Sequence, residues 1–230
     1  MIRRSQNNRI FAVCYRSAAF LLCLAGILDI VGVFRGEVSL ESFLYYTTES
    51  NLLVLFTLGL LLAKTAADLA KNGAVGRASY FERFSAIVSL AILVTFFVFW
   101  GMLAPIYEGG LFTYSNLQIH AVTPLMMVFD HFFFGVPGKM KKQDPLLFAI
   151  FPFGYFLQST VAGLLGMTYS HTGSSAIKHY PYFFLDFEIS KGWVALYVGL
   201  LTVFFLGLAY LLLWLDGKRA KRADRRLSPI

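Results

Sequence analysis

The sequence predicts an all-α integral membrane protein, a bundle of six transmembrane helices with both termini on the cytoplasmic side. Three observations lead to this prediction. The 230 residues are 57% hydrophobic and only 14% charged, whereas soluble domains average about 45–50% apolar and about 25% charged residues. Six apolar runs are each long enough to cross a bilayer, which takes about 20 residues. The basic residues gather beside alternate ends of these runs, as they do in proteins that cross a membrane several times.

The six apolar runs take up most of the chain, and charged residues, glycine or proline interrupt the connections between them. The predicted spans are 11–34, 43–67, 84–107, 117–136, 145–168 and 192–215, followed by a basic cytoplasmic tail, 216–230. Because these spans leave no room for a second, soluble domain, we expect residues 1–230 to form a single integral membrane domain. The longest connection, 169–191, should have structure of its own.

The first run follows several arginines and so superficially resembles a secretory signal peptide. However, it continues to about Phe34, which is longer than the apolar region of a signal peptide, and no small-residue cleavage site follows it. We therefore expect a first helix that is retained.

The placement of the 20 Lys and Arg residues predicts the orientation. All but Arg35, Lys178 and Lys191 fall on one side of a six-span arrangement. Since basic residues favour the cytoplasmic side, both termini are expected in the cytoplasm and the protein in the plasma (inner) membrane. The formal net charge of +7 then reflects orientation and contact with anionic lipid headgroups, and no nucleic-acid partner is expected.

Polar residues inside the runs are costly in a membrane and are the first candidates for function. Thr47, Ser50 and Asn51 stand at i, i+3 and i+4 and so share one helix face. In the fourth run, His120 precedes Asp130 and a second histidine, His131. Thr47 and His120 both lie about four residues into their runs from the same side, roughly 5 Å below the boundary. They would meet if the second and fourth helices are neighbours.

A hydroxyl beside an imidazole is the minimum arrangement for nucleophilic catalysis, because the base removes the proton that makes threonine a poor nucleophile. Structural interpretations stay open beside this one. A membrane threonine often bonds the carbonyl one turn back, and a histidine near a helix end can lie at the interface. Ser50 and Asn51 can join helices by hydrogen bonds. Asp130 can be paired structurally, with His131 or a tyrosine as its expected partner.

Four short blocks along the chain resemble the motifs of a known family. They are an aromatic-Thr-x-x-Ser-Asn-Leu-Leu stretch (46–53), His-x-x-x-Pro with a later Asp (120–130), Phe-Pro-Phe-Gly-Tyr with a later Gly (151–163), and Tyr-Pro-Tyr-x-Phe-Leu-Asp with a later Gly (180–192). In this order they resemble a bacterial six-helix membrane family that is related to the animal androgen-induced and androgen-dependent transmembrane hydrolases. One departure is His131, where the family often has tryptophan.

The resemblance implies an activity. The animal relatives are described as threonine hydrolases that cleave fatty acid esters of hydroxy fatty acids with one Thr and one His, which fall here on Thr47 and His120. A slip of one residue would exchange Thr47 for Thr48, which is rotated by about 100° on the helix. Neither a cofactor nor a metal is implied.

Together, the residues and the resemblance suggest a lipid ester hydrolase, a threonine-type carboxylic ester hydrolase acting on a fatty acid ester. Thr47 would attack the ester, and His120 would act as base and then as acid. Ser50 or Asn51 would donate to the oxyanion. Asp186 is placed with them around the substrate, and either Asp186 or Glu49 would orient the histidine.

Two other functions remain open. A binding or transport protein for a small or lipidic ligand would use the same polar pocket, with Asp130 and His131 on a proton path. A metal site would draw on His120, His171, His179, Glu49 and Asp186. No tight ligand spacing such as His-Glu-x-x-His supports the metal site.

Overall fold

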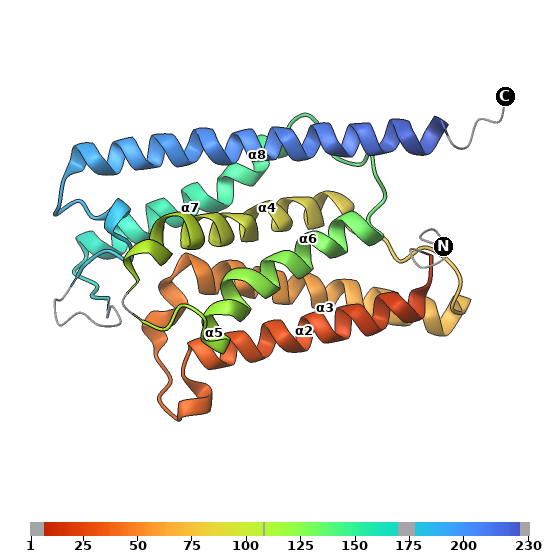
Figure 1. Cartoon of the computed structure of the whole chain (residues 1–230), viewed down its shortest axis with the longest axis horizontal. Coiled ribbons are helices and arrows are strands. Elements are labelled where there is room, and N and C mark those ends of the chain that lie inside the picture. Colours follow the sequence, from red (N-terminus) through yellow and green to blue (C-terminus); the bar gives the residue numbers. More distant parts are fainter. Residues whose placement is uncertain (1–6, 108, 170–177, 226–230) are drawn as a thin grey trace.

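In the computed structural model, residues 7–107, 109–169 and 178–225 are described. This part of the chain contains six helices that are long and apolar enough to cross a membrane (Figure 1), and no strand. They are α2 (Arg9–Ile30), α3 (Tyr46–Asn72), α4 (Glu82–Val98) with the turns η3 (Phe99–Leu103) and η4 (Ala104–Ile106), α5 (Tyr114–Leu117) with η5 (Gln118–Val122) and α6 (Thr123–Phe134), α7 (Asp144–Leu164), and α8 (Lys191–Arg225). The prediction of an all-α fold with six spans is confirmed.

The helix bounds differ from the predicted spans by several residues, most clearly around the first connection and at the end of the last helix. The first helix ends at Ile30, not near Phe34, because Gly32 has φ +88° and a Cβ there would lie 2.1 Å from the Glu37 carbonyl oxygen. A 3₁₀ turn, η2 (Leu40–Leu44), then delays the start of the second helix. At the other end of the chain, α8 continues to Arg225 through residues predicted as a tail. Lysine, arginine and alanine there are good helix formers and extend the helix.

The bundle is built around α4. Figure 1 shows α2 and α3 along one side, α7 and α8 along the other, and α4 and α6 between them. Half of the most apolar window of α4 is buried inside the protein, against 17% for α8. α2 begins and α8 ends at the same end of the bundle, here called the terminal end. The opposite end, where α3 and α8 begin, is called the site end.

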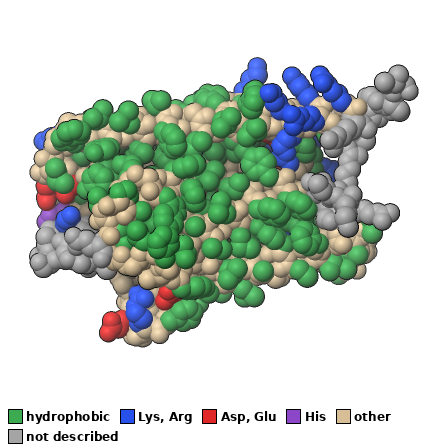
Figure 2. All heavy atoms as spheres, in the orientation of Figure 1, with side chains coloured by type: hydrophobic (Ala, Val, Ile, Leu, Met, Phe, Trp, Pro, Cys, Tyr) green, Lys and Arg blue, Asp and Glu red, His purple; other side chains and the backbone are tan. Residues whose placement is uncertain are grey.

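Apolar side chains fill the bundle in two main clusters that meet at α4. One cluster joins α4 to α2, α3 and α6, and the other joins α4 to α7, α8 and the connection between them. Many further apolar side chains face outward, such as Phe153, Leu200 and Val203. Figure 2 shows them spread over the side of the bundle, with Lys and Arg gathered at the terminal end of α8. This surface suits a lipid environment.

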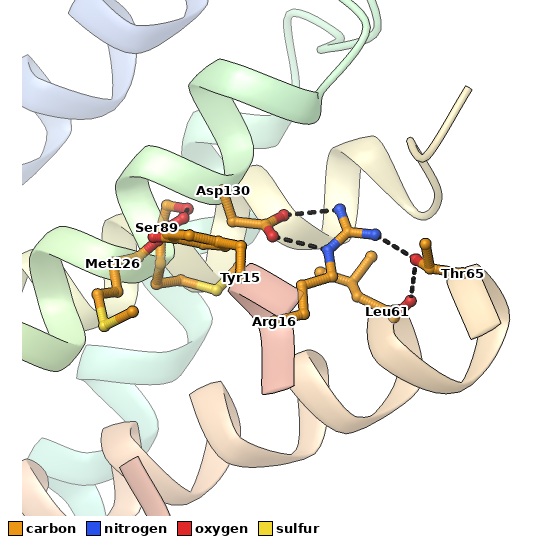
Figure 3. Close-up of polar contacts among 8 residues, drawn as sticks. Tyr15, Arg16, Leu61, Thr65, Ser89, Met126 and Asp130 are labelled. Atoms are coloured by element: carbon orange, nitrogen blue, oxygen red, sulfur yellow. Dashed lines mark hydrogen bonds and ion pairs between the residues drawn. The ribbon is translucent and has the colours of Figure 1, made fainter. Parts of the chain in front are cut away.

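A buried ion pair joins α2 to α6 in the half of the bundle nearer the terminal end (Figure 3). Arg16 donates from Nε to Asp130 Oδ2 at 2.7 Å and from Nη2 to Oδ1 at 2.9 Å. Its Nη1 donates to the Thr65 hydroxyl of α3, which donates in turn to the Leu61 carbonyl. Arg16 is 1% exposed and Asp130 is 2% exposed. The expectation that His131 or a tyrosine would pair with Asp130 is therefore wrong, because both carboxylate oxygens of Asp130 bond Arg16 of α2.

Two further carboxylates close the terminal end. Asp144, fully buried at the start of α7, accepts hydrogen bonds from Arg83 of α4 and from the Lys141 amide. Asp216 of α8 accepts from the amides of Gly138 and Met140, in the connection between α6 and α7. These contacts hold α4, α7 and α8 together at the end where the basic residues gather.

Asp130→Asn should strongly destabilise the protein, because it leaves the buried Arg16 guanidinium without a counter-charge. Removing one partner of a buried pair typically costs about 3–5 kcal/mol, whereas replacing both partners by apolar residues is often neutral. Arg16→Met/Asp130→Leu should therefore recover most of the loss. Thermal unfolding of the detergent-purified protein, followed by tryptophan fluorescence, measures both effects.

Asp29→Asn is the matched control, since Asp29 pairs at 3.6 Å with Arg35, which is exposed, and such pairs contribute about 0–1 kcal/mol. Equal melting temperatures for Asp130→Asn and Asp29→Asn would contradict this account of the buried pair.

Candidate active site

Thr47 and His120 lie against each other at the site end. Thr47 is in the first turn of α3, and His120 is in the π-helical turn η5 that leads into α6. Thr47 Oγ1 is 3.3 Å from His120 Nε2. The structure thus brings the second and fourth spans together at the two residues that the sequence singled out by their equal depth.

The second nitrogen of the His120 ring determines its tautomer. Nδ1 lies 3.2 Å from the carbonyl oxygen of Asn116, one turn earlier. A carbonyl oxygen only accepts, so Nδ1 carries the proton, and in the neutral ring Nε2 is left as the acceptor. The Thr47 hydroxyl therefore donates to Nε2, which is the arrangement a general base needs.

Aromatic residues of the third span hold the imidazole from one face. The ring of Phe99 stacks on His120 with centroids 3.5 Å apart and an angle of 9° between the planes. Trp100 Nε1 donates to the His120 carbonyl at 3.1 Å. Phe99 begins the π-turn η3, so two π-turns meet at this ring. Such turns are rare and are frequent at functional sites, and no sequence pattern predicted them.

Asn51 and Ser50 bond backbone groups at the site. The Asn51 side-chain amide donates to the Thr47 carbonyl at 2.8 Å and to the Ile119 carbonyl at 3.1 Å. Both of its hydrogens are engaged, one within α3 and one in joining α3 to η5. The Ser50 hydroxyl, which is fully buried, contacts the Thr47 carbonyl and the Thr95 hydroxyl. In this structure both residues position Thr47, and neither offers a hydrogen to the oxyanion.

The remaining residues singled out by sequence are placed around this pair. Thr48 is 2% exposed and is not among the residues that line the cavity beside Thr47. Asp186 accepts from the Glu188 amide at 2.9 Å, and Glu49 accepts from Gln158. The group that orients His120 is instead the Asn116 carbonyl.

Among the described residues, the proposed metal ligands are not grouped as a metal site. Within 7–107, 109–169 and 178–225, no group of three or more His, Cys, Asp and Glu side chains is placed to hold a metal ion. His179 contacts the Met167 carbonyl in the connection before α8. His171 lies outside the described residues.

Thr47 lines a cavity between α4, α7, α8 and the connection that contains η6 (Phe183–Leu185). Its empty space is about 820 Å³, including the part open to the surface. Apolar and aromatic side chains form most of the wall. Phe153 lines the cavity and is 45% exposed on α7. The cavity therefore opens through the side of the bundle.

Tyr182 brings a phenol to the Thr47 hydroxyl. Its ring stacks on Phe184 with centroids 5.1 Å apart, and it lines the cavity. Burial raises the pKa of Tyr182 to about 12, against the effect of hydrogen bonds with Thr47 and Tyr155, which lower this pKa. The phenol is thus protonated at neutral pH and able to donate. The Tyr-Pro-Tyr block carried part of the family resemblance, but nothing in the sequence indicated that this side chain reaches Thr47.

Compared with models of known protein families, with curated proteins and with solved structures, the chain matches none. The chemistry of the site is therefore argued from its own geometry. A threonine hydroxyl donates to an imidazole whose tautomer is fixed, and a neutral phenol stands beside it. Thr47 and Tyr182 line an apolar cavity, and His120 lies behind Thr47, in contact with its hydroxyl.

Proposed function

We propose that this protein is a membrane-embedded lipid ester hydrolase with Thr47 as nucleophile and His120 as general base. One observation carries the proposal: the Thr47 hydroxyl faces the accepting nitrogen of an imidazole whose other nitrogen is fixed by a backbone carbonyl. Nucleophile, base and orienting group are the three parts that an activated hydroxyl requires. Four sequence blocks resemble a bacterial membrane family that is related to animal threonine hydrolases, and this resemblance implies the same roles for the same two residues.

The reaction follows from these contacts. His120 Nε2 takes the Thr47 proton as Oγ1 attacks the ester carbonyl carbon, and the carbonyl oxygen becomes an oxyanion. When this intermediate collapses, the bond to the alcohol breaks and protonated His120 gives its proton to the leaving oxygen. The acyl group is then an ester of Thr47. Water that His120 deprotonates attacks this ester, which releases the carboxylic acid and restores the threonine.

The oxyanion requires a hydrogen-bond donor close to Thr47. Asn51 has both amide hydrogens engaged, whereas the Tyr182 phenol interacts with Thr47 and lines the same cavity. As the Thr47 oxygen becomes part of the ester, the phenol hydrogen is free to turn to the new oxyanion beside it. Tyr182 is therefore the proposed oxyanion donor.

The transport alternative is less well supported by the structure. Its proton path required Asp130, and both carboxylate oxygens of Asp130 accept from Arg16. This favours a structural role for Asp130.

The positions of the basic residues support a membrane orientation for the proposed enzyme. We place the terminal end, with its lysines and arginines, in the cytoplasm and the protein in the plasma (inner) membrane. Thr47 and His120 then lie in the outer half of the bilayer. The side opening of the cavity would admit a lipid ester from the membrane.

The first test is labelling of the detergent-purified protein by a fluorophosphonate probe. Wild-type protein should react, and Thr47→Ala and His120→Ala should lose at least about 99% of the labelling, since removal of a nucleophile or its base typically costs 10³-fold or more in rate. Thr48→Ala is the matched control on the adjacent residue and should label normally. Labelling that persists in Thr47→Ala would exclude this threonine as the nucleophile.

Tyr182→Phe should lower kcat for ester hydrolysis by about 10²–10³-fold with little change in KM, as loss of one oxyanion donor does elsewhere. Tyr197→Phe is a control in the same aromatic group, because the Tyr197 ring packs against Phe183 and Tyr197 does not line the cavity. Steady-state kinetics on p-nitrophenyl butyrate measures both. A fall in kcat of similar size in the two variants would argue against a specific role for Tyr182.

The orientation is tested by single cysteines in a Cys14→Ser/Cys23→Ala background. Val38→Cys, at an exposed position of the connection between α2 and α3, should react with a membrane-impermeant maleimide in intact cells. Lys139→Cys, at the terminal end, should react only after the membrane is permeabilised. The reverse pattern would invert the orientation.

A further inference from the structure

The height of the cavity follows from the lengths of the lined stretches on three helices. Its lining residues run from Val94 to Leu103 along the third span, from Phe148 to Phe156 on α7, and from Val198 to Leu206 on α8. At 1.5 Å per residue, each of these stretches is about 12–14 Å long. The three helices thus give one consistent height.

The catalytic pair divides this height into two parts. Phe99 stacks on His120 and marks the level of the pair on the third span. Val94 lies five residues deeper, which is about 7 Å. On α8, Tyr197 packs near Phe184, on which Tyr182 stacks, so the beginning of the lined stretch is level with the site. Phe205 is seven residues beyond Val198, about 10 Å deeper. The space between Thr47 and Phe205 is here called the deep arm.

The deep arm ends on two buried phenylalanines. Phe148 is 1% exposed and Phe205 is 5% exposed. Both belong to the apolar cluster that continues toward the terminal end through Leu90, Ala209 and Leu212, none of which lines the cavity. The two rings therefore form a floor.

The hydroxyls along the deep arm are already engaged. Thr202 donates to the Val198 carbonyl at 2.7 Å, and Thr95 lies 2.6 Å from the Ser50 hydroxyl. The remaining wall is apolar, from Val94 on the third span to Leu206 on α8. An unbranched hydrocarbon chain suits such a space, because burying its methylenes gains free energy and leaves no polar group unpaired.

We propose that the deep arm holds the acyl chain of the ester, and that Phe148 and Phe205 limit its length. This inference rests on the proposed function. An extended chain advances about 1.2 Å per bond, from three bonds per extended residue, so 7–10 Å holds about six to eight bonds. The substrate class is then an ester of a short to medium-chain acid, with the alcohol part directed toward Tyr182 and the connection before α8.

The test is a ladder of p-nitrophenyl esters, from acetate through butyrate, hexanoate, octanoate and decanoate to palmitate. Each methylene that enters the deep arm should raise kcat/KM about fourfold, until the chain meets the floor near octanoate. Longer chains turn out through the side opening, so the rise should stop there. A steady rise to palmitate in the wild type would overturn the inference.

The chain length at which the rise in kcat/KM stops is here called the break. Substitutions in the deep arm should shift this break in opposite directions. Phe205→Ala should shift it to decanoate or beyond. Phe204→Ala, the same change at a neighbouring residue that is 46% exposed and does not line the cavity, should leave the break near octanoate. Ala149→Phe, which fills the deep arm, should shift the break to butyrate and provides the test if Phe205→Ala fails to fold. Equal shifts of the break in Phe205→Ala and Phe204→Ala would contradict the role of Phe205 as the floor of the deep arm.

Binding of fatty acids tests the role of the deep arm independently of the proposed hydrolysis. Saturated acids, from butyrate to palmitate, should raise the melting temperature of the wild type. This rise should show the same break with chain length, without any hydrolysis. If no ester is hydrolysed and the acids still show a break that Phe205→Ala moves, the hydrolase proposal fails and the deep arm stands as a binding site. Hydrolysis without a break would do the reverse.

Discussion

The pairing of Arg16 with Asp130 is the interaction on which the arrangement of the first four spans depends. Hydrocarbon offers neither charge another partner, and an unpaired charge inside the bundle costs several kcal/mol. Because Arg16 also bonds Thr65, one side chain fixes α2, α3 and α6 relative to one another. α4 then packs between this group and the pair of α7 and α8. The contact is specific because the two nitrogens of one guanidinium face the two oxygens of one carboxylate.

A second polar contact plays the same part nearer the site end. Asn51 holds the Thr47 carbonyl and the Ile119 carbonyl with one amide group, and these are the residues at or next to the proposed nucleophile and base. The distance between Thr47 and His120 is thus fixed by a side chain that takes no part in the reaction. Since Arg16 secures the same helices farther along, a shift of α3 along α6 would break both contacts. A site built on the first turns of two helices becomes rigid in this way.

The sequence predicted the features that follow from a regular pattern of residues. It did not predict features that depend on a single side-chain contact. The apolar runs predicted all six spans. Equal depth from one boundary indicated that Thr47 and His120 would meet if their helices are neighbours, and the sequence did not show that they are. Arg16 was counted only as a cytoplasmic charge, because no pattern shows that it turns inward to Asp130. The Asn116 carbonyl and the Tyr182 phenol were missed for a related reason. The Asn116 carbonyl reaches His120 because the helix forms a π-turn there, and Tyr182 reaches Thr47 because the connection before α8 packs against the bundle. Neither feature produces a periodic pattern in the sequence.

The structural ion pair and the proposed catalytic pair differ in the lengths of their hydrogen bonds. Arg16 and Asp130, away from the cavity, bond at 2.7 and 2.9 Å. The contact between Thr47 and His120 is longer, at 3.3 Å, and it lies at the cavity wall beside a phenol that is free to change partner. Bonds of a catalytic pair are commonly long before substrate binds and tighten as the reaction begins. The proposed catalytic contact is thus longer than the structural ion pair, and its threonine lies where an apolar cavity can bring it an ester.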